Sequence, residues 1–215
     1  MSKSFINCSV KLVNSSDVSS KKLDAIVQLH KAAFPGFFLT ILGTQFLGLL
    51  YRGFLDSDSG ICIVAENDNG LIGFVAGTTE PDCFFRTLLK KSGVRFVLAA
   101  IPGLLHNPVI IVRKSFGALF YRGEKPEAMS KAALLSSLAV MPKAAGKGVG
   151  HELVKAFSDE LSRRGLKAVY LTTDASDNDS VNRFYEKCGF CLLDTIERSG
   201  NRRMNRWTMD LANSA

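Results

Sequence analysis

Three glycines, Gly146, Gly148 and Gly150, stand at alternate positions in the segment AVMPKAAGKGVGHEL, between an apolar run and an amphipathic one. Glycines at such a place expose backbone N–H groups just before a helix, and both the N–H groups and the helix N-terminus favour phosphate oxygens. The spacing supplies neither the GxxxxGK[ST] of a Walker loop nor the early GxGxxG of a Rossmann turn. Two interpretations remain: a phosphate cradle of a third kind, or a flexible turn without a ligand.

A second block of residues that could do chemistry, NDSVNRFYEKCGF, follows about 40 residues later and begins at Asn178. The first block, extended to LSSLAVMPKAAGKGVGHELV, resembles the central motif of the GNAT N-acetyltransferase superfamily. In that motif a strand reading L-x-V-x-P precedes R/Q-x-x-G-x-G and a helix. The second block resembles the superfamily's N-x-x-A-x-x-[FL]-Y-x-K-x-G-F. The resemblance covers a hairpin expected from residue 60 and all of residues 132–211.

The resemblance implies a role for each part of the two blocks. The strand residues Leu138, Ala139 and Val140 would pair with the pantetheine arm of acetyl-CoA, and a backbone N–H near Leu138 would polarise the thioester carbonyl. Tyr185 is the implied general acid toward the CoA sulfur, and Asn178 is an implied contact to the cofactor arm. The pyrophosphate would rest on the loop residues Gly146, Lys147, Gly148, Val149 and Gly150.

One residue departs from the family pattern. Ala145 stands where the superfamily usually has Arg or Gln at the start of the loop. Because the loop binds through backbone N–H groups, we expect this change to weaken cofactor binding without abolishing it, and Lys147 is the candidate replacement for the lost charge. Structural roles stay open for Tyr185, as an aromatic ring packed under the sheet, and for Asn178, as a helix cap.

Acetyl transfer also needs a group that takes a proton from the attacking amine. Many superfamily members carry an acid on the fourth strand, but residues 132–140 contain none. Glu80, just after the third expected strand, is our first candidate, and Asp174, at the end of the fifth, is the second. Either carboxylate could act through a water, and either could be a solvated loop residue. None of the three histidines has partner residues at a spacing that would indicate catalysis: His30, His106 and His151.

The composition is that of one globular domain. The chain has 215 residues, 47% of them hydrophobic, without repeats or low-complexity tracts, so we treat residues 1–215 as a single domain. The N-terminal segment lacks the apolar core of a signal peptide, which predicts a cytoplasmic location. Five scattered cysteines favour a reducing compartment. Cys188 and Cys191 form a lone CxxC without the second pair that zinc would need, so we expect no metal.

Hydrophobic periodicity predicts a mixed α/β domain. The superfamily resemblance implies that its sheet is central, mixed and mostly antiparallel, with helices flanking it. We expect a helix capped at Ser16-Asp17, and a hairpin turn at Asn69-Gly70. Pro102 and Pro108 should interrupt the segment after a helix over residues 84–100. The expected strands are 8–14, 60–66, 71–79, 132–140, 167–173, 190–196 and 203–211. The other expected helices are 37–55, 151–164 and 180–187.

Residues 81–131 lie outside the resemblance, between the third and fourth expected strands, where superfamily members usually have a tight turn. Residues 83–125 hold eight basic residues against one acidic residue, which accounts for nearly all of the net charge of +7. The uncharged run 96–112 is too short and too rich in proline for a transmembrane helix. We interpret this insertion as a helical lid, and residues 32–51 as the wall, of an acceptor pocket. A homodimer interface and a peripheral membrane contact are the alternatives.

These observations predict an N-acetyltransferase that transfers an acetyl group from acetyl-CoA to a primary amine of a small molecule. Basic charge beside apolar surface suits an anionic, partly apolar acceptor, such as an amino-sugar nucleotide or a lipid-linked amino sugar. The run AFPGFFLTILGTQFLGLLYRGFL is similar to acetyltransferases found with bacterial surface-polysaccharide enzymes.

Three further classes share some of these features. A peripheral membrane protein, or a CoA-binding regulatory protein of the same fold without catalysis, would carry the same motifs. A pI of about 9.2 suggests a nucleic-acid binder. However, the basic segment lacks the alternation of aromatic and basic residues of a stacking platform, so we expect no nucleic-acid partner.

Overall fold

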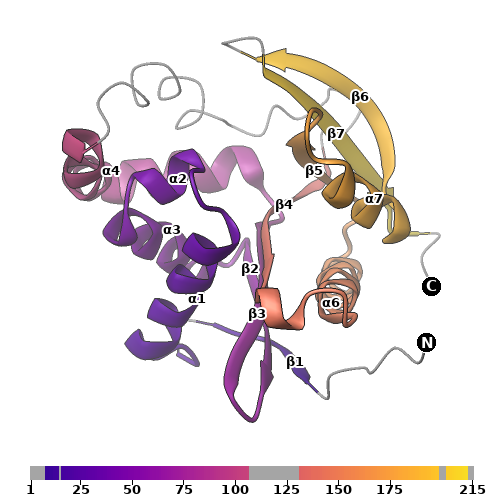
Figure 1. Cartoon of the computed structure of the whole chain (residues 1–215), viewed down its shortest axis with the longest axis horizontal. Helices are drawn as coiled ribbons and strands as arrows, with labels where there is room; N and C mark the ends of the chain where they lie inside the picture. The colour runs from indigo at the N-terminus through magenta and orange to yellow at the C-terminus, as the bar shows by residue number, and fades with distance from the viewer. Residues whose placement is uncertain (1–7, 15, 107–130, 199–201, 213–215) are drawn as a thin grey trace.

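The structure is a computed structural model that describes residues 8–14, 16–106, 131–198 and 202–212 (Figure 1). The strands are β1 (Ser9–Leu12), β2 (Gly60–Asn67), β3 (Gly70–Thr78), β4 (Ala133–Val140), β5 (Ala168–Asp174), β6 (Cys191–Arg198) and β7 (Arg202–Asp210). The helices are α1 (Ser20–Ala33), α2 (Phe38–Ile41), α3 (Thr44–Asp56), α4 (Pro81–His106), the 3₁₀-helix η2 (Pro142–Ala144), α6 (Val149–Arg163) and α7 (Asp179–Lys187).

All seven strands belong to one mixed sheet, in the order β1-β2-β3-β4-β5-β7-β6. Neighbouring strands are antiparallel except for β4 and β5, which run parallel. The helix α4 joins β3 to the segment that precedes β4. The predicted mixed, mostly antiparallel sheet with a helical insertion between its third and fourth strands is therefore confirmed.

Two hydrophobic cores cover the two faces of the sheet, because successive strand residues point to opposite faces. Figure 1 shows α1, α2, α3 and α4 to the left of β1–β4, and α6 to the right. Phe74 of β3 packs in the core with α1, α3 and α4, whereas Val75 packs in the core with α6. Both side chains are completely buried, so β3 is covered on both sides. This burial fixes the register of the strand that pairs with β4.

The first helices differ from the prediction at their ends. The helix α1 begins at Ser20, and Ser19 is its N-cap, with a side chain that accepts a hydrogen bond from the N–H of Lys22. Asp17 instead closes the preceding turn by accepting the N–H of Asn14. The single helix expected over residues 37–55 is divided into α2 and α3 by Gly43, whose φ of 100° is incompatible with a continuous helix.

The insertion begins with α4, which is longer than predicted. Pro102 lies inside this helix and does not end it. A proline removes one helical hydrogen bond, and packing against the rest of the protein offsets that cost. Phe84 of α4 stacks on Phe54 of α3, with ring centroids 4.5 Å apart. Pro108 and the rest of the insertion as far as residue 130 lie outside the described residues. No helix within the described ranges is both long and apolar enough to cross a membrane.

The contact between α4 and α2 allows a test with two glycines of the same helix. A Cβ at Gly103 would lie 2.2 Å from the carbonyl oxygen of Ile41, whereas a Cβ at Gly93 would meet nothing within 4 Å. We expect Gly103→Ala to lower the free energy of unfolding by about 1–3 kcal/mol through overpacking. The control Gly93→Ala should raise it by about 0.5–1 kcal/mol, because alanine favours helix. Urea denaturation of both variants measures this, and equal effects would mean that α4 is not seated on α2.

Candidate active site

The parallel strands β4 and β5 pair over only two residues each. Ala133 pairs with Val169 and Leu134 with Tyr170, after which β4 continues beside β3 and β5 continues beside β7. Residues 135–140 and 171–174 therefore face each other across a gap in the hydrogen-bond ladder, which we call the β4–β5 opening. An unpaired strand edge can accept an extended ligand through backbone hydrogen bonds.

A β-bulge lies at the closed end of the β4–β5 opening. The register moves from Ala76 opposite Ser137 to Gly77 opposite Leu135, which leaves Ser136 as the extra residue of β4. Ser136 is exposed, while the residues on both sides of it are buried. A bulge increases the local twist of a strand and changes the direction of its side chains. Here it follows directly on the last residues that β4 shares with β5.

The backbone groups of Leu138 and Val140 point into the β4–β5 opening. Met141 donates its N–H to the carbonyl of Ile72, at the end of the pairing with β3. Since backbone groups of successive strand residues point to alternate edges, those of Ala139 also point toward β3. The N–H and C=O groups of Leu138 and Val140 then face the opposite edge. This is the arrangement that the predicted pairing with a pantetheine arm requires.

The glycine loop leads from the end of β4 into α6. Gly146 and Gly148 have φ angles of 73° and 87°, which other residues adopt only with strain. Gly148 is the N-cap of α6 and has no side chain to cap it, so the first N–H groups of this helix remain available to an anion. Gly150 serves a different purpose, because a Cβ there would lie 3.1 Å from the ring of Phe184 on α7.

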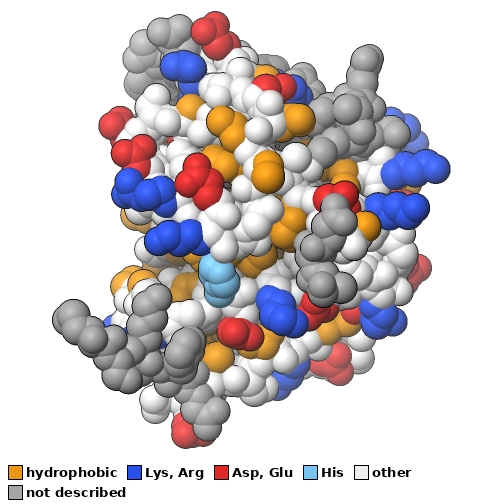
Figure 2. Space-filling model, turned by 90° about the vertical axis from the view of Figure 1, so that its right-hand side faces the viewer, with side chains coloured by type: hydrophobic (Ala, Val, Ile, Leu, Met, Phe, Trp, Pro, Cys, Tyr) orange, Lys and Arg blue, Asp and Glu red, His pale blue; other side chains and the backbone are white. Residues whose placement is uncertain are grey.

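Positive charge near the loop comes from lysines. Ala145 is the C-cap of η2 in extended conformation, and it brings no charge to the loop. Lys143 and Lys147 are both exposed on either side of it. Figure 2 shows the face with α6 and α7, where Lys and Arg side chains are interspersed with Asp and Glu side chains and with hydrophobic ones. The backbone of the loop therefore provides the local preference for an anion, and the lysines add to it.

Tyr185 is buried near the end of α7. Its ring packs edge-on against Phe184 and Phe190, with centroids 5.1 and 5.5 Å away, and 7% of its surface stays exposed. Burial raises the pKa of its hydroxyl far above the usual range, because the phenolate form would lose its hydration. The hydroxyl therefore keeps its proton at any working pH and is available as a hydrogen-bond donor. Packing and a donor role are compatible in this position.

A buried hydrogen-bond chain holds α7 against the sheet. The indole N–H of Trp207 on β7 donates to Thr173 on β5 at 2.8 Å, and the Thr173 hydroxyl donates to Asn182 on α7 at 2.6 Å. The Asn182 amide donates in turn to the carbonyl of Asp174 at 3.3 Å. These positioning residues were missed by the sequence analysis. Polar side chains within otherwise apolar strand and helix faces are the signal that could have indicated them.

Asn178 and Asp174 lie next to each other where β5 ends. Asn178 occupies the N-cap position of α7, but its side chain does not cap the helix; it donates to the carbonyl of Asp174 at 3.3 Å. Both carboxylate oxygens of Asp174 accept hydrogen bonds from Arg202 at 2.5 and 2.8 Å. By strand alternation Asp174 shares a face with Tyr170, which packs near Phe85 of α4. Asp174 therefore lies at the β4–β5 opening, on the side of α4.

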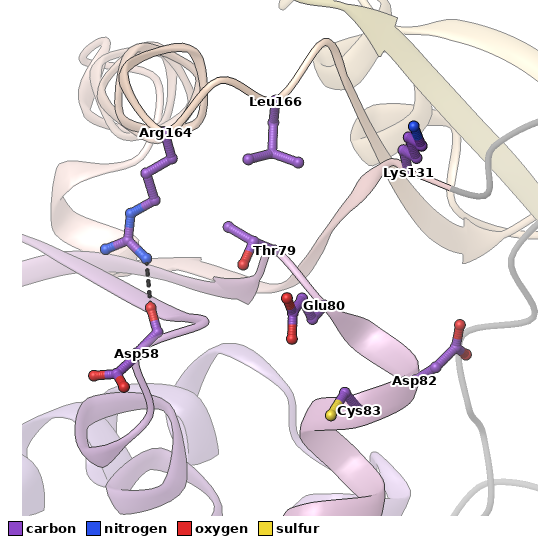
Figure 3. A pocket seen from close by; sticks show the side chains of 8 residues that line it. All are labelled: Asp58, Thr79, Glu80, Asp82, Cys83, Lys131, Arg164 and Leu166. Carbon is purple, nitrogen blue, oxygen red and sulfur yellow. Dashed lines mark hydrogen bonds between the residues drawn. The ribbon is translucent and has the colours of Figure 1, made fainter.

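Glu80 lies elsewhere, in a pocket of about 560 Å³ at the other end of β4 (Figure 3). Thr78, the last residue of β3, pairs with Leu134 and lies three strand residues, or roughly 10 Å, beyond Val75, the partner of Leu138. Glu80 follows two residues after the end of the strand. At this separation we expect a proton from an amine beside Leu138 to reach Glu80 only through water. The pocket is lined by Asp58, Thr79, Glu80, Asp82, Cys83, Lys131, Arg164 and Leu166.

The histidines are engaged in local contacts. His30 is buried, bonds through Nδ1 to the Tyr51 hydroxyl at 2.6 Å, and has its pKa lowered to about 4 by burial. The Tyr51 hydroxyl also interacts with Ser137 of β4. His106 bonds to a carbonyl of its own helix, and His151 lies 3.4 Å from the Cys188 sulfur. All five cysteines are free, and the described part of the chain holds no cluster of three metal-binding side chains.

The chain is similar to known acetyltransferases in sequence. A family model described as the acetyltransferase (GNAT) family matches residues 23–190. A stretch of 66 residues is 38% identical to an Arabidopsis thaliana protein named "Probable N-acetyltransferase HLS1-like". That stretch is 31% of this chain and 16% of the plant protein, so the chain matches less than a fifth of this relative's length.

Solved structures with the same fold come from several organisms. A protein from Desulfovibrio desulfuricans assigned to the GNAT family superposes with a TM-score of 0.60, at 12% identity over 94% of this chain and 99% of that one. The ribosomal-protein-S18-alanine N-acetyltransferase of Escherichia coli gives a TM-score of 0.55, at 13% identity over 94% of both chains. Since the family model spans well over half of the sequence, the chain belongs to the acetyltransferase (GNAT) family.

Proposed function

We propose that this chain is an N-acetyltransferase that transfers an acetyl group from acetyl-CoA to a primary amine of a small molecule. One observation carries the proposal: the glycine loop and the N-terminus of α6 follow β4, the strand whose edge is free in the β4–β5 opening. The free backbone edge at Leu138 and Val140 suits an extended arm with amide groups. The loop and the N-terminus of α6, at the end of the same strand, suit a pyrophosphate. Few ligands combine these two parts, and acetyl-CoA is one of them.

The residues around the β4–β5 opening divide the chemistry among them. Acetyl-CoA supplies a thioester, whose carbonyl becomes more electrophilic when its oxygen accepts the N–H of Leu138. Tyr185 keeps its proton through burial and donates to the departing sulfur. Asn178 and the residues Ala145, Gly146, Lys147, Gly148, Val149 and Gly150 hold the cofactor by the contacts predicted from the sequence.

We assign the amine side of the reaction to Asp174. It lies at the β4–β5 opening on the side of α4, whereas Glu80 follows the end of β3 beside the start of β4. Because both Asp174 oxygens are bonded to Arg202, the carboxylate would orient the amine and take its proton through a water.

Asp174→Asn should then slow acetyl transfer far more than Glu80→Gln does, as measured by thiol release from acetyl-CoA.

The acceptor we propose is anionic and partly apolar, such as an amino-sugar nucleotide or a lipid-linked amino sugar. Its support is the insertion: α4, its first helix, packs Phe85 near Tyr170 on the side of Asp174, and residues 83–125 hold eight basic residues against one acidic residue. A thiol-release assay with acetyl-CoA and a panel of amines tests this. The panel contains amino-sugar nucleotides, aminoglycosides, polyamines and peptides. Preference for any class other than amino sugars overturns the acceptor. If acetyl-CoA binds and no amine releases thiol, a non-catalytic CoA-binding protein is the better description.

Gly146 and Gly165 provide a matched test of the glycine loop. Both have positive φ, +73° and +79°, both have free space for a Cβ, and they lie at opposite ends of α6. Alanine should cost each variant about 1–2 kcal/mol of folding free energy. Only Gly146→Ala should also raise the KM for acetyl-CoA, by about tenfold, because it disturbs the backbone that faces the pyrophosphate. An equal KM in both variants would locate the pyrophosphate away from this loop.

Tyr185→Phe tests the general acid. The ring keeps its packing against Phe184 and Phe190, so the free energy of unfolding should change by less than about 1 kcal/mol. The kcat for acetyl transfer should fall by about 10²–10⁴-fold, with little change in the KM for acetyl-CoA. A thioester with a more acidic thiol should recover part of the lost rate, because its sulfur leaves without a proton. Unchanged kcat would remove the role from Tyr185.

A further inference from the structure

The exposed face of α4 carries more apolar surface than any other described element. Six of the ten large hydrophobic side chains that are exposed lie on this helix. Five of them follow the spacing of one helical face: Val94, Val97, Leu98, Ile101 and Leu105. We call these five residues the α4 stripe. Val94 and Leu105 are each 75% exposed and Leu98 is 60% exposed, so the stripe is open to solvent along about three helical turns.

The opposite face of the same helical segment is already in the core. Phe96, Ala99 and Ala100 are buried, and Phe96 packs edge-on against Phe46 of α3 at 4.9 Å. The second half of α4 is therefore apolar on both sides, although its sequence needs only one apolar side to pack on the protein. A helix that is apolar all round indicates a second apolar environment.

The charge beside the α4 stripe has one sign. Arg86, Lys90, Lys91 and Arg95 are all exposed, and none of them forms an ion pair with another described residue. Residues 83–106 contain no acidic residue. Lys90 and Lys91 stand one helical turn before Val94, so they extend the exposed face of the stripe. The face of the molecule in Figure 2 is different, because acidic and basic side chains alternate over it.

We infer that the α4 stripe and its four cations bind the surface of a lipid bilayer that contains anionic lipids. The stripe would lie in the plane of the interface, with its apolar side chains among the acyl chains and the cations at the headgroups. The described helices include none that could cross a membrane, so the contact is peripheral. Figure 1 shows α4 passing α2 to the outer edge of the helical layer.

A second copy of the chain is a poorer partner for this face. A twofold contact brings the same patch together from both copies, so four cations would face four cations at close range. A standard interface also uses about 20–30 residues a side, against the five large residues of the stripe. An anionic bilayer neutralises the same cations and has no size limit. This inference does not depend on the proposed acetyl transfer.

Co-sedimentation with vesicles tests the inference on the full chain. Wild-type protein should pellet with vesicles of phosphatidylcholine and phosphatidylglycerol in equal parts, and it should stay in the supernatant with phosphatidylcholine alone. Val94→Gln/Leu98→Gln should lower the partition coefficient by at least tenfold, through lost apolar burial. Lys90→Gln/Lys91→Gln/Arg95→Gln should lower it by roughly a hundredfold, at about 1 kcal/mol for each cation near the surface.

Two control variants match these changes elsewhere on the surface. Leu192→Gln/Leu193→Gln removes two apolar residues that are 51% and 40% exposed on β6, and Lys21→Gln/Lys167→Gln/Lys187→Gln removes three exposed cations. Both controls should bind the anionic vesicles within twofold of wild type. Loss of binding in the controls to the same degree, or no binding by wild type, overturns the inference. So does a wild-type dimer in sedimentation velocity that Val94→Gln/Leu98→Gln makes monomeric, since the stripe would then belong to a second copy.

Discussion

The short pairing between β4 and β5 is the constraint on which the rest of this molecule depends. A sheet gains stability from every added ladder hydrogen bond, and here two parallel strands stop pairing after Leu134 and Tyr170. The strands can diverge because each is held on its other side, β4 by β3 and β5 by β7. The bulge at Ser136 falls where the divergence begins. The sheet is thus kept intact while one pair of edges is left free for a ligand.

Separate sets of contacts fix the two sides of this gap. On the β5 side, Trp207, Thr173 and Asn182 join β7, β5 and α7 through buried hydrogen bonds, which are costly to break because their donors would be left without water. On the β4 side, the glycine loop and α6 follow the strand directly, and Gly150 allows α6 to approach Phe184 of α7. The two sides therefore meet at the helices, although their strands do not pair. That contact sets the distance between the glycine loop and Tyr185.

Much of the fold and part of the site could be predicted from the sequence, where neighbouring residues carry the signal. The predicted turns are marked by glycines, and Gly70 in the hairpin, Gly146 and Gly148 in the loop, and Gly165 after α6 all have positive φ. The start of α1 was misplaced because several serines there can serve as caps, and only packing selects Ser19. Pro102 was misjudged because tertiary contacts of α4 outweigh the local preference.

The relative placement of Glu80 and Asp174 could not be predicted, for a different reason. It depends on the register of β3 against β4 and on where β5 leaves β4, which are contacts between residues about 35 to 65 positions apart. Both carboxylates follow a strand, and in the sequence they look equivalent. The family membership is shown by the comparison, whereas the residue roles are proposals from this geometry.

The buried pair of His30 and Tyr51, beneath β4, also sets how the fold responds to acid. Burial lowers the pKa of His30 to about 4, whereas the same side chain in an unfolded chain titrates near 6.5. Above about pH 6.5 His30 is neutral in both the folded and the unfolded chain, so it contributes no pH dependence to the folding free energy. Below pH 6.5 His30 becomes protonated in the unfolded chain, whereas in the folded chain it stays neutral down to about pH 4. Folding free energy is lost across that interval, by up to about 3 kcal/mol, so the core beneath β4 is less stable in acid than at neutral pH.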